Sequence, residues 1–109
     1  MRLHFEVTGS KGNVYEVKVE KEGANINAYC TCQAGVNGLY CKHRFALMDG
    51  DISNLASRNP QDVEKFRIAM RGTDLEAAYK EFLKADTQFQ EAKKSLDGAK
   101  KNLAKAMFR

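Results

Sequence analysis

The sequence contains no hydrophobic run longer than a few residues among its 109 positions. A transmembrane helix needs about 20 consecutive apolar residues, and a secretory signal needs an apolar core of about 7 to 15, so we expect neither. Cysteine is scarce as well: there are three, and an odd number cannot pair completely into disulfides. Unpaired cysteines are typical of a reducing compartment. We therefore expect a cytoplasmic protein about one domain long, or a nucleoid or nuclear one if it binds DNA.

Paired carboxylates and a glycine-rich phosphate loop are also missing, and both are common signatures of enzymes. The 18 basic and 14 acidic residues give a formal net charge of +4, which is less than a dedicated DNA-coating protein would carry. The charge alone therefore does not decide between a nucleic-acid and a protein partner. We expect a binding protein and not an enzyme, with no small-molecule substrate and no membrane contact.

All three cysteines and one of the two histidines fall between positions 30 and 43. Their order is C-x-C, eight further residues, then C-x-H. Three thiolates and one imidazole complete a tetrahedral zinc shell, which leaves no position open for a substrate. The intervening segment has two glycines and an Asn-Gly turn signal, as a loop that folds back on itself requires. We predict one structural Zn²⁺ with the ligands Cys30, Cys32, Cys41 and His43.

Three other interpretations of these cysteines compete with zinc. A disulfide is disfavoured by the odd number and by the missing secretory signal. Buried free thiols would not require this spacing. A nucleophilic Cys/His pair lacks a third, orienting group in any recognisable local motif.

The C-x-C, short loop, C-x-H pattern runs into the apolar segment 45–47 and resembles the SWIM zinc-finger family. The strand-like segment 14–19 is similar to the family's lead-in, and the resemblance covers roughly residues 13–50. Members occur in bacterial proteins linked to helicase-like ATPases, in Mutator-type transposases, and in recombination and chromatin factors. The resemblance implies zinc binding together with DNA or protein contact, and it implies no reaction.

The chain predicts an α+β fold. Apolar and polar residues alternate over 2–8, 14–20 and 25–30, with turns between them, so we expect a three-stranded antiparallel meander. A short helix should follow from about residue 41 to 48. We assign 1–50 to a SWIM-like zinc-finger domain, to whose folding free energy zinc would contribute on the order of 10 kcal/mol.

Residues 51–109 predict a helical hairpin. Asn59 and Pro60 open the first helix as N-cap and first residue, and Gly72 ends it. Thr73 and Glu76 form a capping box for a second helix over about 74–109. At 1.5 Å per residue this helix is about 54 Å long, so the preceding helix can cover only its first turns.

Large apolar residues and alanines each recur every seven residues along this last helix, with the alanines three positions after the large residues. This heptad seam is typical of a helix that packs lengthwise on a partner, although alanine is also a good helix former by itself. We expect homodimerisation through the seam; folding back, or docking on a different helical protein, is the alternative. The seam consists of Leu75, Ala78, Phe82, Ala85, Phe89, Ala92, Leu96, Ala99, Leu103 and Ala106.

Basic residues also gather in the last third of the helix. A solvated face is the default explanation, and a contact with nucleic-acid phosphate is the functional one. Lys42 and Arg44, which flank the ligand His43, are the corresponding candidates in the zinc finger. The nucleic-acid candidates are Lys42, Arg44, Lys93, Lys94, Lys100, Lys101 and Lys105.

Overall fold

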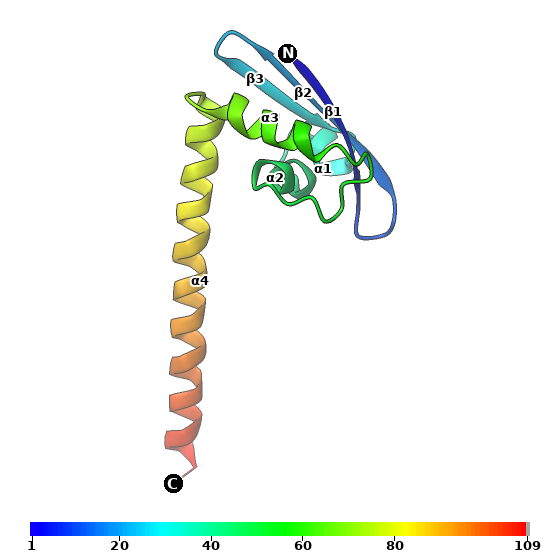
Figure 1. Cartoon of the computed structure of the whole chain (residues 1–109). Coiled ribbons are helices and arrows are strands. Elements are labelled where there is room, and N and C mark those ends of the chain that lie inside the picture. Colours follow the sequence, from blue (N-terminus) through cyan, green and yellow to red (C-terminus); the bar gives the residue numbers. More distant parts are fainter. Residues whose placement is uncertain (109) are drawn as a thin grey trace. The chain divides into compact units, whose positions relative to one another are not determined.

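A computed structural model of the chain describes residues 1–108. It has three strands and four helices, and it divides into two compact units, Met1–Glu76 and Ala77–Arg109. Figure 1 shows the elements in chain order.

The sheet is the antiparallel meander that the alternation predicts. Its strands are β1 (Arg2–Thr8), β2 (Val14–Glu22) and β3 (Asn25–Cys30), in the order β1-β2-β3. Phe5 pairs with Val17 across β1 and β2, and Val17 pairs with Cys30 across β2 and β3. Because side chains alternate along a strand, all three of these residues point to one buried face of the sheet. The register therefore places Cys30, the last residue of β3, next to the core.

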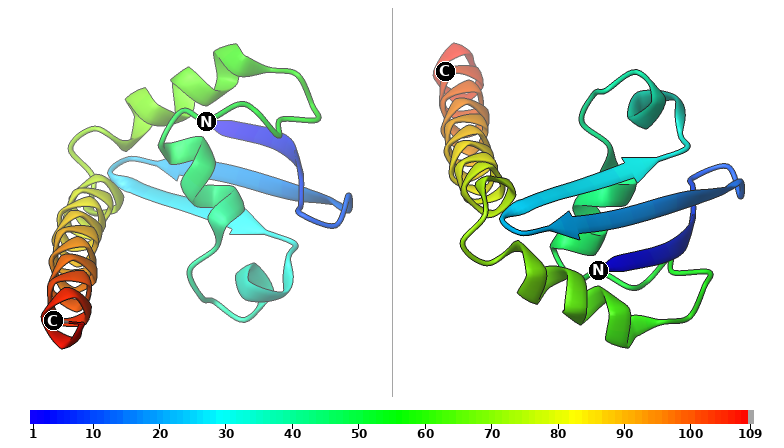
Figure 2. Two further views of the ribbon diagram at one scale, coloured as in Figure 1. Left: turned by 90° about the horizontal axis from the view of Figure 1, so that it is seen from below. Right: turned by 90° about the horizontal axis from the view of Figure 1, so that it is seen from above.

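Helix α2 (Lys42–Met48) lies across this face, as both views in Figure 2 show, and α3 (Pro60–Met70) lies on the β1 side of it. Phe66 of α3 and Phe5 of β1 are fully buried, and their ring centroids lie 6.4 Å apart. The sequence predicts that α3 belongs to a helical region, 51–109, separate from the zinc finger. The structure instead places it in the first unit, because its apolar stripe completes the core under the sheet.

The two predicted helix caps differ in the structure. Asn59 is the N-cap residue of α3 and Pro60 occupies its first turn, but the Asn59 side chain makes no capping hydrogen bond to the backbone; its amide donates instead to the Asp62 carboxylate at 3.0 Å. Before α4 (Asp74–Met107), the Thr73 hydroxyl accepts the Glu76 backbone N–H at 3.3 Å. The Glu76 carboxylate accepts the backbone N–H of Gly72 at 3.2 Å. In a standard capping box it would instead accept the N–H of the N-cap residue itself, which is Thr73.

Helix α4 is 34 residues long and buries none of them. Beyond Tyr79 every described residue is exposed, including Phe89 at 62%, Leu96 at 55% and Leu103 at 59%. The long C-terminal helix is thus confirmed, while its pairing in a hairpin or a coiled coil stays a prediction. Within residues 1–108, no helix combines the length and the apolar character needed to cross a membrane.

Candidate metal centre

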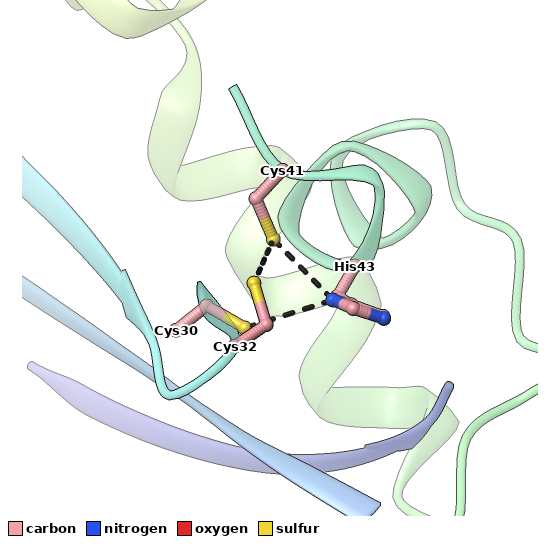
Figure 3. A group of neighbouring side chains, drawn as sticks. All are labelled: Cys30, Cys32, Cys41 and His43. Atoms are coloured by element: carbon pink, nitrogen blue, oxygen red, sulfur yellow. Dashed lines mark hydrogen bonds between the residues drawn. The ribbon is translucent and has the colours of Figure 1, made fainter. Parts of the chain in front are cut away.

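Local structure brings the four predicted ligands together, as Figure 3 shows. Cys30 is the last residue of β3, and Cys32 caps the short helix α1 (Gln33–Val36), where its sulfur accepts the Gly35 N–H at 3.3 Å. Cys41 precedes α2 as its N-cap residue, and His43 lies in the first turn of that helix. Two chain segments, a strand end and a helix start, therefore supply two ligands each.

The turn at Thr31 is fastened to β2. Its backbone N–H donates to the Glu16 carbonyl at 3.1 Å, and its hydroxyl accepts the Glu16 N–H at 3.0 Å. These two bonds extend the strand pairing past Cys30 and fix the direction in which the chain turns toward Cys32.

The spacing of the ligand atoms is close to that of a tetrahedral zinc site. All four lie within 4.8 Å of one another, and all four residues are buried. The Nδ1 atom of His43 is 3.5 Å from the Cys41 sulfur and 3.8 Å from the Cys30 sulfur, and the sulfurs of Cys32 and Cys41 are 3.4 Å apart. Zinc bonds of about 2.3 Å to sulfur and about 2.1 Å to nitrogen place neighbouring tetrahedral ligands roughly 3.5 to 3.8 Å apart. The buried Cys₃His site therefore fits one structural Zn²⁺.

Burial is the largest influence on the protonation of three of the four ligands. Burial raises the pKa of the Cys30 thiol to about 12, partly opposed by the Cys32 backbone N–H. Burial also acts to raise the pKa of Cys41, but hydrogen bonds from the Arg44 backbone and from neighbouring thiols outweigh it, so this pKa is lowered from its ordinary value. Burial, and then the charge of Lys42, lower the pKa of His43, which keeps the imidazole in the neutral form that binds metal. Buried thiolates are stable only beside a positive charge, and a divalent metal ion would supply that charge here.

The ring of Tyr15 in β2 packs against the imidazole of His43. The two ring centroids lie 4.8 Å apart at an interplanar angle of 38°. The Nε2 atom of His43 is buried without a hydrogen-bond partner among the described residues, whereas Nδ1 faces the sulfurs. The alternation of residues 14–20 predicts a strand but does not indicate that Tyr15 contacts a metal ligand.

Of the two nucleic-acid candidates beside His43, Arg44 has internal partners. Its guanidinium donates to the Ala28 carbonyl at 3.1 Å and also to the carbonyl of Leu39. These bonds tie the loop before Cys41 to β3, so Arg44 positions the metal loop. Lys42 is exposed, and so are the predicted lysines of α4.

The model of the SWIM zinc finger family matches residues 15–48, which contain all four ligands. Residues 15–48 are a SWIM zinc finger. No curated protein and no solved structure shows significant similarity to the chain.

The surface of this SWIM zinc finger is apolar around its metal loop. Val36 is 70% exposed, Leu39 61% and Tyr40 59%. Leu39 and Tyr40 also line a hollow of ≈ 350 Å³, together with Ile26 and Met48. A second cavity, of ≈ 490 Å³, lies on the side of α2 that carries Lys42 and Asp49, facing the end of β1.

Proposed function

We propose that the SWIM zinc finger is a nucleic-acid-binding module in an accessory protein, and that the metal holds its contact loop in shape. The observation that carries this proposal is the exposure of Leu39 and Tyr40 directly before a metal ligand, with the exposed cation Lys42 directly after it. Exposed apolar side chains gathered at one place are typical of an interaction surface.

The chemistry of this loop fits a nucleic-acid strand. Aromatic side chains such as Tyr40 stack on bases of any sequence, and a lysine contacts phosphate as a point charge. The ring of Tyr40 packs near Phe45 of α2, with centroids 5.8 Å apart, which limits the conformations of the side chain. The hollow beside the loop offers apolar walls for an unstacked base.

The lysines of α4 would add contacts to phosphate that do not depend on sequence. Five lysines and one acidic residue lie between positions 92 and 108, and all are exposed. A nucleic acid bound only there would not require zinc, whereas one bound at the loop would.

Fluorescence anisotropy with short labelled single- and double-stranded DNA tests the proposal, over a salt series and with or without a zinc chelator. We expect binding that weakens with salt, is lost on chelation and falls about tenfold in Lys42→Glu. Lys65→Glu, an exposed lysine of α3, is the matched control and should bind like the wild type. Binding that survives chelation would move the contact to α4, and no binding at low salt would refute the proposal.

A second function is favoured by the exposed seam of α4. Phe89, Leu96 and Leu103 are each more than half exposed at heptad spacing, which in water costs free energy that a partner helix would recover. The chain would then be an adaptor that dimerises through α4 and contacts other proteins through the zinc finger, without binding DNA. Sedimentation showing a monomer at high micromolar concentration would refute this dimerisation.

A further inference from the structure

The charges of α4 are unevenly distributed along its length. Positions 74–91 hold five acidic and two basic residues, whereas positions 92–108 hold five basic and one acidic residue. Two such helices attract each other when they run in opposite directions, because each acidic half then lies beside a basic half. Running in the same direction, they would place like charges together over their whole length.

The sizes of the side chains along the seam also favour an antiparallel pair. In a parallel pair, equivalent positions face each other, so Phe would meet Phe in one layer and Ala would meet Ala in the next. In an antiparallel pair, the position of the large residue faces the position of the alanine. Every layer then contains one large and one small side chain, which allows a uniform and close approach of the two helices.

We propose that α4 pairs antiparallel with α4 of a second copy, in the register that places Phe89 opposite Ala92 of the second copy. This inference rests on the dimerisation proposed above and specifies its geometry. The same register places Phe82 opposite Ala99 and Leu96 opposite Ala85. It also places Leu103 opposite Ala78, so the exposed seam of the second unit is covered throughout.

The residues that flank the seam support this register. Asp86 lies opposite Lys93 of the second copy, and the two-fold symmetry repeats this attraction on the other side. On the opposite flank Glu81 meets Asn102, and Gln88 meets Ser95, so no like charges face each other. In a parallel pair Glu81 would instead face Asp86 of the second copy, which is repulsive.

The arrangement separates the equivalent ends of the two helices. Because Ala77 lies level with residue 104 of the second copy, the two Ala77 residues are about 40 Å apart along the paired helices, at 1.5 Å per residue. The dimer would therefore carry its two zinc-finger attachment points at opposite ends of the helix pair, and not side by side.

Charge reversal at the flanking pair tests the geometry in the full-length, zinc-loaded protein. Dissociation constants of the wild type, Asp86→Lys, Lys93→Asp and the double variant are measured by sedimentation equilibrium at low salt. We expect each single variant to dissociate on the order of tenfold more readily, since it creates two like-charge pairs. The double variant should return to within about threefold of the wild type, and an equimolar mixture of the two single variants should form heterodimers. Lys94→Asp, on the outer face, is the matched control and should change little.

The outcomes separate the geometry from the dimerisation itself. A wild-type protein that stays monomeric at high micromolar concentration overturns both. A wild-type dimer that becomes tighter in Asp86→Lys overturns only the antiparallel pairing, because a parallel pair would then gain an attraction between Glu81 and the new lysine. Single variants that behave like Lys94→Asp overturn the register. Circular dichroism of each variant confirms that α4 is still helical.

Discussion

At the scale of single residues, Gly35 has a specific steric role in the metal loop. A Cβ atom built at this position would lie 2.9 Å from the Cys30 Cβ and would contact the Cys30 carbonyl oxygen even more closely. Backbone atoms cannot move aside as the tip of a flexible side chain can. Only glycine lets α1 pack this closely on the residue that supplies the first ligand.

We therefore expect Gly35→Ala to weaken zinc binding about tenfold or more, as the turn carrying Cys32 is pushed away from Cys30. Competition with a chromophoric chelator measures the zinc affinity. Gly98→Ala is the matched control, because a Cβ atom there meets nothing within 4 Å and the site lies in α4. If Gly35→Ala holds zinc as tightly as the wild type does, the steric argument is wrong.

The ligands could be predicted from sequence because their chemistry and spacing are local. Cys30, Cys32, Cys41 and His43 are complete as a set within one short segment, and no long-range information was needed to group them. The contacts of Tyr15 and Arg44 could not be predicted in this way. Each depends on how β2 or β3 is placed against α2, which no residue spacing specifies.

At the scale of elements, α3 shows the same division between local and long-range information. Local sequence predicts its proline, its N-cap residue and its apolar stripe. An apolar stripe shows that a helix packs on something, but it does not identify the surface on which the helix packs. Sequence analysis paired it with the last helix, whereas Phe66 packs on β1. Helix α1 was missed because it has only four residues, too few for a periodic pattern, and begins at a metal ligand.

The position of α3 leads to a prediction about stability. Phe66→Ala should destabilise the zinc-loaded first unit by about 3 to 5 kcal/mol, since it removes a fully buried ring in contact with Phe5. Ile68→Ala, on the same helix but half exposed, should cost much less. Chemical denaturation followed by far-ultraviolet circular dichroism compares the two. Equal effects would mean that α3 is not part of the core under the sheet.

At the scale of the whole molecule, the two units are stabilised in different ways. The first has a small core and a metal site, and a domain of about 76 residues buries only a modest apolar area without additional cross-links. The second is one helix with an exposed seam, so its stability should depend on protein concentration through its partner.

Zinc removal should consequently affect the two units unequally. We expect chelation to unfold the first unit, because three buried thiolates and His43 lose the ion that holds them together. Helical signal from α4 should persist and remain concentration-dependent. Amide NMR spectra resolve the two units, and a thiol reagent reports on the metal site: the three cysteines should label slowly with zinc and rapidly after chelation. A cysteine that labels rapidly in the zinc-loaded protein would contradict the closed site, and it would favour a reactive thiol over a structural one.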